Sequence, residues 1–349
     1  MEIGKERKQM LDLMLRPAFM VKDGLICHIN PAAGYLLLTQ GSPIAPLLAS
    51  GLEEYGDFTD CLQLKLQIGS RILDTTVLRK DDGDIFLPDS IPAEERFRML
   101  SLVSMQLREP MTGLTTTAER IAENADPNCV AQSNRYMHQM LRILSNMSDV
   151  QRFARRENCR MEYTEVCGFV EEILEKASAL LEEANICVES RLSWTNIYAL
   201  LDREQIERAI YNLLSNAAKF GRENGPIRVE LSQKAQRLQL SVTNGSRTKL
   251  SPGNFYDRYL REPGLEDPAQ GLGVGMVLVS SAAANHGGAV LIDQPEGCLR
   301  VTMTLKVQHR KDGQIRSPIL GMDYAGERDH GLLELSDVLP AKLYCMEKN

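Results

Sequence analysis

The 349-residue sequence contains no apolar run long enough to span a bilayer. Residues 1–16 mix charged and apolar side chains, so they lack the basic flank, apolar core and small-residue cleavage site of a secretory signal. There is no run of basic residues, and the net charge is −7 with a pI near 5.5. This charge balance argues against nucleic acid or an anionic membrane as the main partner. We therefore expect a cytoplasmic protein.

Metal-binding and disulfide patterns are missing as well. The eight cysteines are scattered, with neither a Cys-x-x-Cys motif nor a Cys/His cluster. We expect reduced, mostly buried thiols and no zinc site. What the chain has is the composition of a globular protein, 43% hydrophobic and 25% charged. Its length suits roughly two or three domains.

The first ninety residues predict a small α/β domain. We expect a short helix at 10–15, a hairpin at 19–27 that turns at Lys22-Asp23-Gly24, and a helical piece near 32–38. Three further strands are predicted, at 62–68, 72–78 and 85–87. This order, with the passage MVKDGLICHINPAA, resembles a PAS sensor domain. Such domains often hold a ligand, but His28 is a lone histidine inside a strand, where a packing or surface role is commoner than a haem or metal contact.

Two amphipathic helices are predicted next, broken at Asp126-Pro127-Asn128. Apolar residues recur every three or four positions in both, at Leu100, Val103, Leu107, Met111, Leu114, Ala118 and Ile121, and at Met137, Leu141, Leu144, Met147 and Ala154. A single hairpin cannot bury both apolar seams, so pairing with a second copy into a four-helix bundle is predicted. Docking of these helices against the chain's own domains is the alternative.

Within the first of these helices, residues 104–112 read SMQLREPMT. This stretch resembles the phosphoacceptor box of sensor histidine kinases, whose frame it keeps at Ser104, Leu107, Arg108, Pro110 and Thr112. The resemblance implies a histidine nucleophile where Met105 stands, its carboxylate base at Gln106, and a threonine or asparagine at Glu109. A thioether cannot accept the phosphoryl group and an amide cannot act as a general base. Self-phosphorylation at the usual site is therefore predicted to be absent.

A helix opening at Asp202 carries a candidate binding face. Asp202 with Gln205 has the form of a capping box, and the helix should run to about Phe220. Asn212, Asn216 and Lys219, spaced four and three apart, then share one face. Amide oxygens can ligate a hard cation and the lysine offsets phosphate charge, so the face suits a magnesium-bound triphosphate. A polar helix face against water is the alternative.

A glycine-rich stretch follows downstream. Gly271, Gly273 and Gly275 alternate before an apolar helical run that ends at Gly287-Gly288. Glycines let the backbone approach a ligand, and a helix N-terminus offers N–H groups and a positive dipole end to an anion. An ordinary turn would have the same composition.

Taken together, these motifs carry a second resemblance. NLLSNAAKF is similar to the N-box of the histidine kinase/gyrase-type ATPase fold, GLGVGM and NHGG resemble its last glycine box and the turn beyond, and NFYDRYLR resembles its F-box, with Arg258 on the family arginine. The resemblance covers residues 94–307. It implies an α/β-sandwich ATPase domain with ATP and Mg²⁺ as cofactors, the Mg²⁺ held at Asn216 through ATP.

The first glycine box departs from the family pattern Asp-Asn-Gly-x-Gly, since this chain has Thr243-Asn244-Gly245-Ser246-Arg247. The resemblance places the adenine-recognising aspartate at Thr243, and losing a charge-assisted hydrogen bond weakens binding roughly tenfold to a hundredfold. ATP binding is therefore predicted to be weakened. Asn212 stands where relatives that hydrolyse ATP with water carry a glutamate base, so a gyrase-like ATPase is not expected.

The sequence thus predicts an α+β multidomain protein: a PAS-like sensor (1–92), a dimerisation hairpin (93–160), an ATPase domain (161–308) and a tail (309–349). The resemblance implies a homodimer in two-component signalling that lacks its acceptor histidine and acts by conformation on a response regulator or a partner histidine kinase. Phosphorylation of a partner in trans, or serine/threonine kinase activity, is the enzymatic alternative. A short helix is expected at 332–339, and the tail could add to a sheet, dock or stay disordered.

Overall fold

The structure is a computed structural model, and it describes most of the N-terminal region (residues 1–92), most of the region predicted to be ATPase-like (residues 161–308) and the second long helix. The described residues are 8, 10–14, 17–69, 71–88, 127–153, 159–192, 197–222, 225–245, 274–307 and 329–345. Several residues singled out above lie outside these ranges: Met105, Gln106, Glu109, Arg258, Gly271 and Gly273. The predictions made for them stay predictions.

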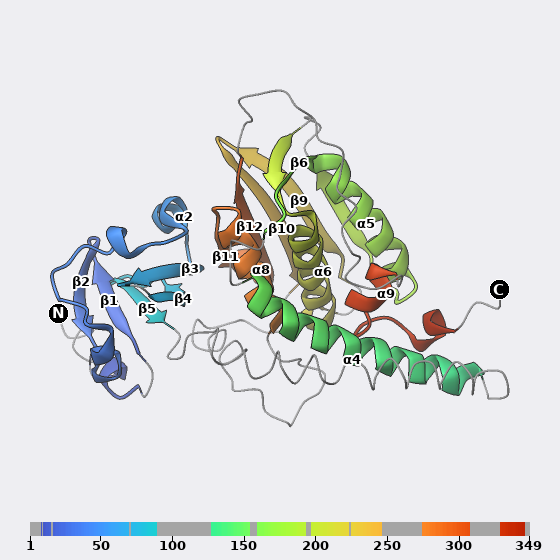
Figure 1. The fold of residues 1–349 in the computed structure, drawn as a ribbon, viewed down its shortest axis with the longest axis horizontal. Helices are drawn as coiled ribbons and strands as arrows, with labels where there is room; N and C mark the ends of the chain where they lie inside the picture. Colours follow the sequence, from blue (N-terminus) through green and yellow to red (C-terminus); the bar gives the residue numbers. More distant parts are fainter. Residues whose placement is uncertain are drawn as a thin grey trace.

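The N-terminal region is an antiparallel sheet with short helices on its connections (Figure 1). A hairpin of β1 (Phe19–Lys22) and β2 (Leu25–Ile29) precedes the helices η1 (Pro31–Leu36), η2 (Ala45–Leu47) and α2 (Leu52–Asp57). Strands β3 (Cys61–Ile68), β4 (Arg71–Leu78) and β5 (Asp84–Pro88) follow, in the spatial order β2-β1-β5-β4-β3. The strand predictions are confirmed, whereas α2 was not predicted because six residues are too few to show a helical period.

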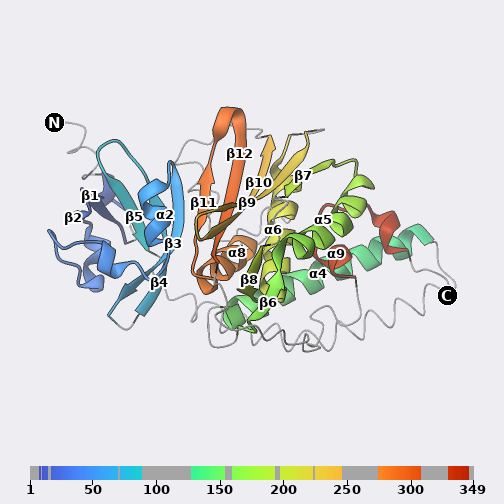
Figure 2. The ribbon, with the colours of Figure 1, turned by 90° about the horizontal axis from the view of Figure 1, so that it is seen from above.

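The ATPase-like region has two layers, with helices packed on one face of a sheet (Figure 2). The helices are α5 (Val166–Glu182), α6 (Arg203–Phe220) and α8 (Val274–Asn285). The strands are β7 (Val188–Leu192), β9 (Ile227–Lys234), β10 (Arg237–Gly245), β11 (Val290–Asp293) and β12 (Cys298–Lys306), with η5 (Pro295–Gly297) before β12. A separate pair of strands, β6 (Glu162–Glu165) and β8 (Tyr198–Leu201), flanks α5 and α6. The predicted α+β fold class is confirmed.

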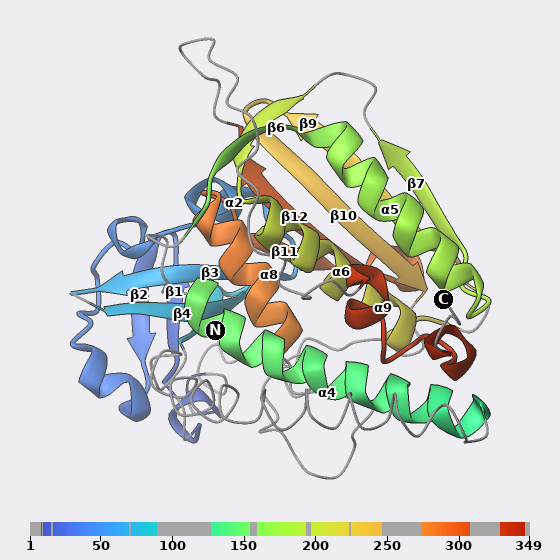
Figure 3. The same cartoon turned by 45° about the vertical axis from the view of Figure 1, so that its right-hand side comes forward.

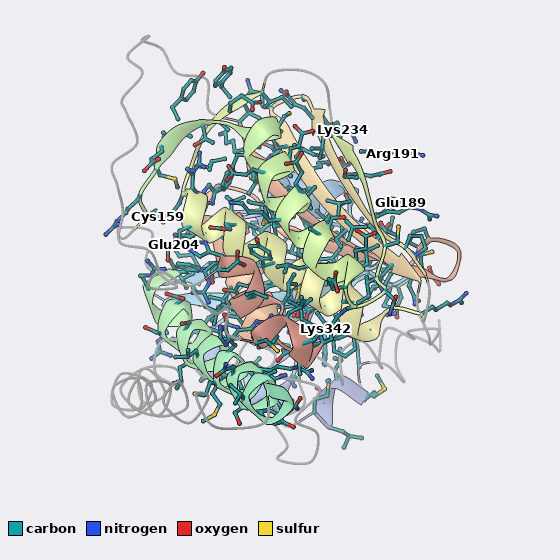
Figure 4. The ribbon with its side chains drawn as sticks, turned by 90° about the vertical axis from the view of Figure 1, so that its right-hand side faces the viewer. Cys159, Glu189, Arg191, Glu204, Lys234 and Lys342 are labelled. Atoms are coloured by element: carbon teal, nitrogen blue, oxygen red, sulfur yellow. The ribbon has the colours of Figure 1, made fainter. Side chains whose placement is uncertain are left out.

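The two sheets join edge to edge. Strand β3 pairs antiparallel with β11 at Gln63–Val290, Leu62–Leu291 and Cys61–Ile292, which makes one ten-stranded sheet in the order β2-β1-β5-β4-β3-β11-β12-β10-β9-β7. An exposed strand edge carries unpaired N–H and C=O groups, and β3 satisfies those of β11. At the far edge, Glu189 and Arg191 project from β7 into solvent (Figure 4), and such charges discourage further pairing.

The long helix α4 (Pro127–Phe153) crosses the lower ends of α6 and α8 (Figure 3). Five of its buried side chains are polar and three are apolar: Asn134, Arg142, Ser145, Asn146 and Asp149, and Ala131, Leu144 and Phe153. The apolar side chains Tyr136, Met140 and Ile143 are 55%, 48% and 41% exposed on another face. The helix therefore docks on the ATPase-like region through its polar side and leaves an apolar stripe uncovered by the described residues.

The last described segment, residues 329–345, contains α9 (His330–Glu334) and η6 (Ala341–Tyr344). Figures 3 and 4 place it between α4, α5 and α6. Among the three outcomes left open for the tail, this part docks. Within the described ranges, no helix has the length and apolar character needed to cross a membrane.

Candidate functional site

Helix α6 starts where the capping pattern predicted. The Asp202 carboxylate accepts the Gln205 backbone N–H at 3.1 Å, and Gln205 Nε2 donates to its other oxygen at 3.2 Å. The Asp202 N–H, which a capping box would satisfy through Gln205, donates instead to Nε2 of the buried His286 at 2.9 Å. His286 lies just after α8, so this bond fixes the start of α6 against the end of α8.

The polar face of α6 is mostly buried. Asn212 is 1% exposed and donates through Nδ2 to the carbonyl of Arg208 at 2.8 Å. Arg208, one turn earlier on the same face, is 0% exposed. The Lys219 side chain is 14% exposed, and Asn216, which lies between Asn212 and Lys219 in the sequence, is half-buried. The predicted shared face is therefore real, and it continues back to an arginine that the sequence reasoning did not include.

The first described glycine of the last glycine box packs directly on this face. A Cβ on Gly275 would come within 2.5 Å of Asn212 Oδ1, so no other residue fits there without displacing Asn212. The start of α8 consequently lies against the middle of α6. This brings together two predicted site residues that are 63 positions apart in the sequence.

Helix α4 contributes Arg142 to the same place. The Arg142 side chain is 6% exposed and donates to Asn212 Oδ1 at 3.3 Å. It also contacts two carboxylates of the C-terminal segment, Asp337 at 2.5 Å and Glu334 at 3.4 Å. Lys219 forms an ion pair with the same Asp337 oxygen. Two cations from different helices thus meet at one carboxylate.

Arg208 joins the other half of the cluster. Its Nε lies 3.2 Å from Glu334 Oε1, and both side chains are 0% exposed. On its other side it donates to Asn146 Oδ1 of α4 at 2.6 Å and pairs with Asp149. Buried charges are stable only when paired in this way. We call Arg142, Arg208 and Lys219, from α4 and α6, the basic cluster.

The basic cluster holds Asp337 in its charged form. Burial by itself raises the pKa of this carboxyl, but the charges of Arg142 and Lys219 outweigh that effect, so the pKa of Asp337 lies below its usual value of 3.8. Asp337 is therefore an anion at neutral pH. In this state it pairs with Arg142 and Lys219 of the basic cluster.

Strand β10 places the residues of the first glycine box on two different faces. Leu238, Leu240 and Val242 are buried against the helices, and Asn244, two residues on, is 5% exposed on that same face. Thr243 and Gly245 alternate to the opposite face, where Thr243 is in register with Arg300 of β12. Asn244 also lies beside Gly221 at the end of α6, 3.6 Å from a Cβ built there. The helix-side position is thus Asn244, although the sequence resemblance pointed to Thr243.

Of the predicted site residues, the structure brings Asn212 and Gly275 to the basic cluster, which includes Lys219. It places Asn216 on α6 with Asn212 and Lys219. Sequence reasoning missed Arg142, Arg208, Glu334 and Asp337. Arg208 could have been found, since it precedes Asn212 by one turn. The others come from segments whose contact with α6 only the tertiary fold reveals.

The donors present fit a phosphate-bearing ligand. Guanidinium and ammonium groups are the strongest side-chain partners of phosphate oxygens, and the basic cluster supplies both types beside an amide. For a nucleoside triphosphate, Arg142, Asn212 and Lys219 are the groups that would hold the phosphates. In the structure Arg142 and Lys219 instead contact carboxylates of the C-terminal segment, and Asn212 accepts a hydrogen bond from Arg142.

Comparison with known proteins gives the following. Residues 201–309 match the family described as "Histidine kinase-, DNA gyrase B-, and HSP90-like ATPase". The chain is 23% identical over 329 residues to the sensor histidine kinase WalK of Bacillus subtilis (strain 168), a match that covers 83% of this chain and 53% of WalK. It is 27% identical over 224 residues to the sensor protein KdpD of Escherichia coli (strain K12), covering 60% of this chain and 24% of KdpD.

A likeness is also found to the crystal structure of full-length ShkA in complex with AMPPNP. The TM-score is 0.48 and the identity is 20%, with 62% of this chain and 47% of that chain covered. Of the two curated relatives, the chain spans about half the length of WalK and about a quarter of the length of KdpD.

Proposed function

Starting from the membership of this chain in the sensor histidine kinase family, we propose that it is a two-component-type signalling protein that binds Mg-ATP weakly and acts through conformation and partner contacts. The observation that carries the proposal is the basic face of α6. This face carries Arg208, Asn212 and Lys219, and Asn212 meets Gly275 at the start of α8, within the matched ATPase family region. Asn216 on this helix is the proposed Mg²⁺ contact, made through ATP.

The adenine end of the proposed site is assigned to Asn244. Its amide lies on the helix-covered face of β10, where Thr243 does not point. An amide is an uncharged acceptor, so the expected affinity stays below that of a site with a carboxylate, by roughly tenfold to a hundredfold. We therefore keep the proposal of weakened ATP binding, with Asn244 in place of Thr243 as the adenine contact.

The absence of self-phosphorylation is proposed from side-chain chemistry. Met105 and Gln106 occupy the nucleophile and base positions of the box, and neither can do that chemistry. The histidines in the described ranges already have partners: His28 with Asp12, His138 with the Asn134 carbonyl, His286 with Asp202, and His330 with Glu207. These contacts favour structural roles for all four.

A homodimer through residues 93–160 is proposed from α4. Its exposed stripe of Tyr136, Met140 and Ile143 has the spacing of a helix–helix contact, and the ATPase-like region covers the polar side. These residues differ from the apolar set predicted from the sequence, of which Leu144 is buried. A second copy, paired as a four-helix bundle, would bury the stripe. A response regulator or a partner histidine kinase would then read the state of the dimer.

Calorimetric titration of the full chain with Mg²⁺ and a non-hydrolysable ATP analogue tests the nucleotide proposal. We expect weak binding that Asn244→Ala and Asn216→Ala reduce about tenfold, whereas Thr243→Val leaves it unchanged. No binding at millimolar analogue would overturn the proposal. An equal loss for Thr243→Val would show that the strand face has been assigned wrongly.

A second candidate function, phosphorylation of a partner in trans, is favoured by one observation. The N-box residues Asn212, Asn216 and Lys219 are all present on one helix, as the transfer of phosphate from ATP would need. Incubation with labelled ATP and candidate response regulators or histidine kinases separates the two functions. Label on a partner histidine would replace the conformational proposal, and label on a serine or threonine would indicate the serine/threonine kinase alternative.

A further inference from the structure

The C-terminal segment, residues 329–345, is anchored as firmly as a core element. Leu333, Leu335, Leu339 and Tyr344 are each at most 4% exposed, and the last three belong to the hydrophobic core that includes α5 and α6. The Asp329 side chain caps α9 by accepting the Leu332 N–H at 2.9 Å. Burial of several large apolar side chains gives this segment one defined position.

Side chains of helix α4 hold the C-terminal segment by donating hydrogen bonds to its backbone carbonyls. Gln139 Nε2 donates to the Ser336 carbonyl at 3.1 Å, and Arg135 donates to the carbonyls of Ser336 and Asp337 at 3.3 Å each. Asn134 donates to the Tyr344 carbonyl at 3.0 Å, and the His138 ring meets the Tyr344 ring edge at 4.9 Å between centroids. These bonds fix the register of the segment, and so they fix which side chains it presents to α6.

The side chains presented are carboxylates. Glu334 enters between Arg142 and Arg208, and Asp337 between Arg142 and Lys219. Arg142 and Lys219 are the groups that would hold phosphate in the proposed function, and Arg142 also donates to Asn212. Two anions of the chain itself therefore contact the cations that the proposed function assigns to phosphate.

Charge balance makes the two occupants exclusive. Buried cations are unfavourable without an anion, so the basic cluster needs either the carboxylates or an equivalent anion. Phosphate oxygens brought beside Glu334 and Asp337 would meet like charge at a few ångströms, which opposes joint binding. One set of anions must leave before the other can bind.

We propose that residues 329–345 are a built-in competitor of the nucleoside triphosphate, in which Glu334 and Asp337 occupy the basic cluster whenever the nucleotide phosphates do not. The inference rests on the proposed function, since it takes a nucleotide as the second occupant. It goes beyond that function by making affinity depend on a segment that follows the ATPase family match, which ends at residue 309.

Release of the segment also removes some of the contacts that hold α4, while Asn146 and Asp149 of this helix stay bonded to Arg208 of α6. The segment receives hydrogen bonds from Asn134, Arg135 and Gln139 of α4, and Arg142 of α4 loses two of its anionic partners when the segment leaves. A nucleotide that displaces the segment therefore loosens the helix proposed to form the dimer. The competition thus links occupancy of the ATPase-like region to the conformation of the hairpin.

The test is a calorimetric titration of the full chain with Mg²⁺ and AMPPNP, comparing wild type with Asp337→Asn. The substitution keeps the shape and removes the charge, at a side chain that is 25% exposed and so tolerant of change. We expect binding about tenfold tighter, because weaker docking of the segment raises the fraction of chains open to nucleotide. Glu334→Gln should act in the same direction.

Glu183→Gln is the matched control. This carboxylate also contacts the segment, through Lys342, but lies outside the basic cluster and is 48% exposed. The affinity of the Glu183→Gln protein for AMPPNP should equal that of wild type. Deletion of residues 329–349 is a less clean variant because it uncovers the apolar core, so the point variants carry the test.

Hydrogen exchange supplies the second readout. In wild type, Mg²⁺ and AMPPNP should increase exchange of the amides of α9 and of residues 335–339. Equal affinities in wild type and Asp337→Asn, with the segment still protected in the presence of nucleotide, would overturn the inference and leave the proposed function standing. Absence of binding to every variant would overturn the proposed function and this inference with it.

Discussion

Strand β3 and residues 329–345 both contact the ATPase-like region from outside it, and they do so by different chemistry. Strand β3 joins β11 by main-chain pairing, whereas residues 329–345 join α4 and α6 through buried ion pairs. Main-chain pairing depends little on side-chain charge and leaves nothing for a ligand to replace. Ion pairs can be exchanged for another anion. The first contact is therefore suited to hold a domain and the second to be released.

The sheet contact has a small polar centre of its own. Thr304 Oγ1 donates to Glu54 at 2.6 Å and accepts the Ala289 N–H at 2.9 Å, and Arg237 lies 3.2 Å from the same Glu54 oxygen. These groups belong to α2, β10, β12 and the turn before β11. We call Glu54, Arg237 and Thr304 the seam triad. Like the basic cluster, the seam triad joins residues of different segments through an ion pair and hydrogen bonds.

The largest effect is expected from Arg208→Ala. Its removal leaves Asp149 and Glu334 without a common buried partner, and breaking such pairs costs about 3–5 kcal/mol. Thermal or denaturant unfolding measures the loss. Arg228→Ala, at an ion pair with both side chains more than half exposed, is the control and should change stability by about 0–1 kcal/mol. Equal losses would mean that the basic cluster contributes no more than surface charge.

An intermediate effect is expected from Thr304→Val in the seam triad. The variant keeps the shape, removes the hydroxyl that bonds Glu54, and should cost about 1–3 kcal/mol. Nucleotide affinity should not change, because the seam triad lies away from the basic cluster. Unfolding and AMPPNP titration, run on the same variant, measure both. A changed affinity would show that the sheet contact also controls the site.

A smaller effect on the docking of residues 329–345 is expected when the pH is lowered. The pKa of Asp337 is lower in the docked segment than in a free one, so docking is at full strength above the ordinary value of 3.8 and weakens as the pH falls through the depressed pKa. Cleavage of residues 332–339 by an acid protease should therefore rise below about pH 4. Asp337→Asn should lack this step, and an identical pH profile in both proteins would contradict the assignment.

The smallest effect is expected from Lys342→Ala. Its ion pair with Glu183 is 63% and 48% exposed, and exposed pairs contribute about 0–1 kcal/mol. Neither segment protection nor nucleotide affinity should change measurably. Hydrogen exchange and titration check this result, and a clear loss of protection would mean that the segment is held by surface charge as well as by the basic cluster.

Much of the fold could be predicted because its signals are local. Alternation predicted β3 and β4, and the Asp202 cap predicted the start of α6. Strand β11 was missed because its four residues follow a glycine turn and show no period of their own. The shared face of Asn212 and Lys219 also followed from spacing alone. The resemblance pointed to Thr243 for the adenine contact, but the alternation of β10 turns Thr243 away from the helices.

The sequence by itself determined that an ATPase-like region is present and that its α6 face carries amides and a lysine. The replacement of an acceptor histidine by Met105 stays a prediction. Helical and strand periods carry this information within a few turns. The tertiary structure alone decided what faces those groups. Arg142 and Glu334 lie far from Asn212 in the sequence, and only packing of α4 and the C-terminal segment brings their charges together where burial forces them to pair.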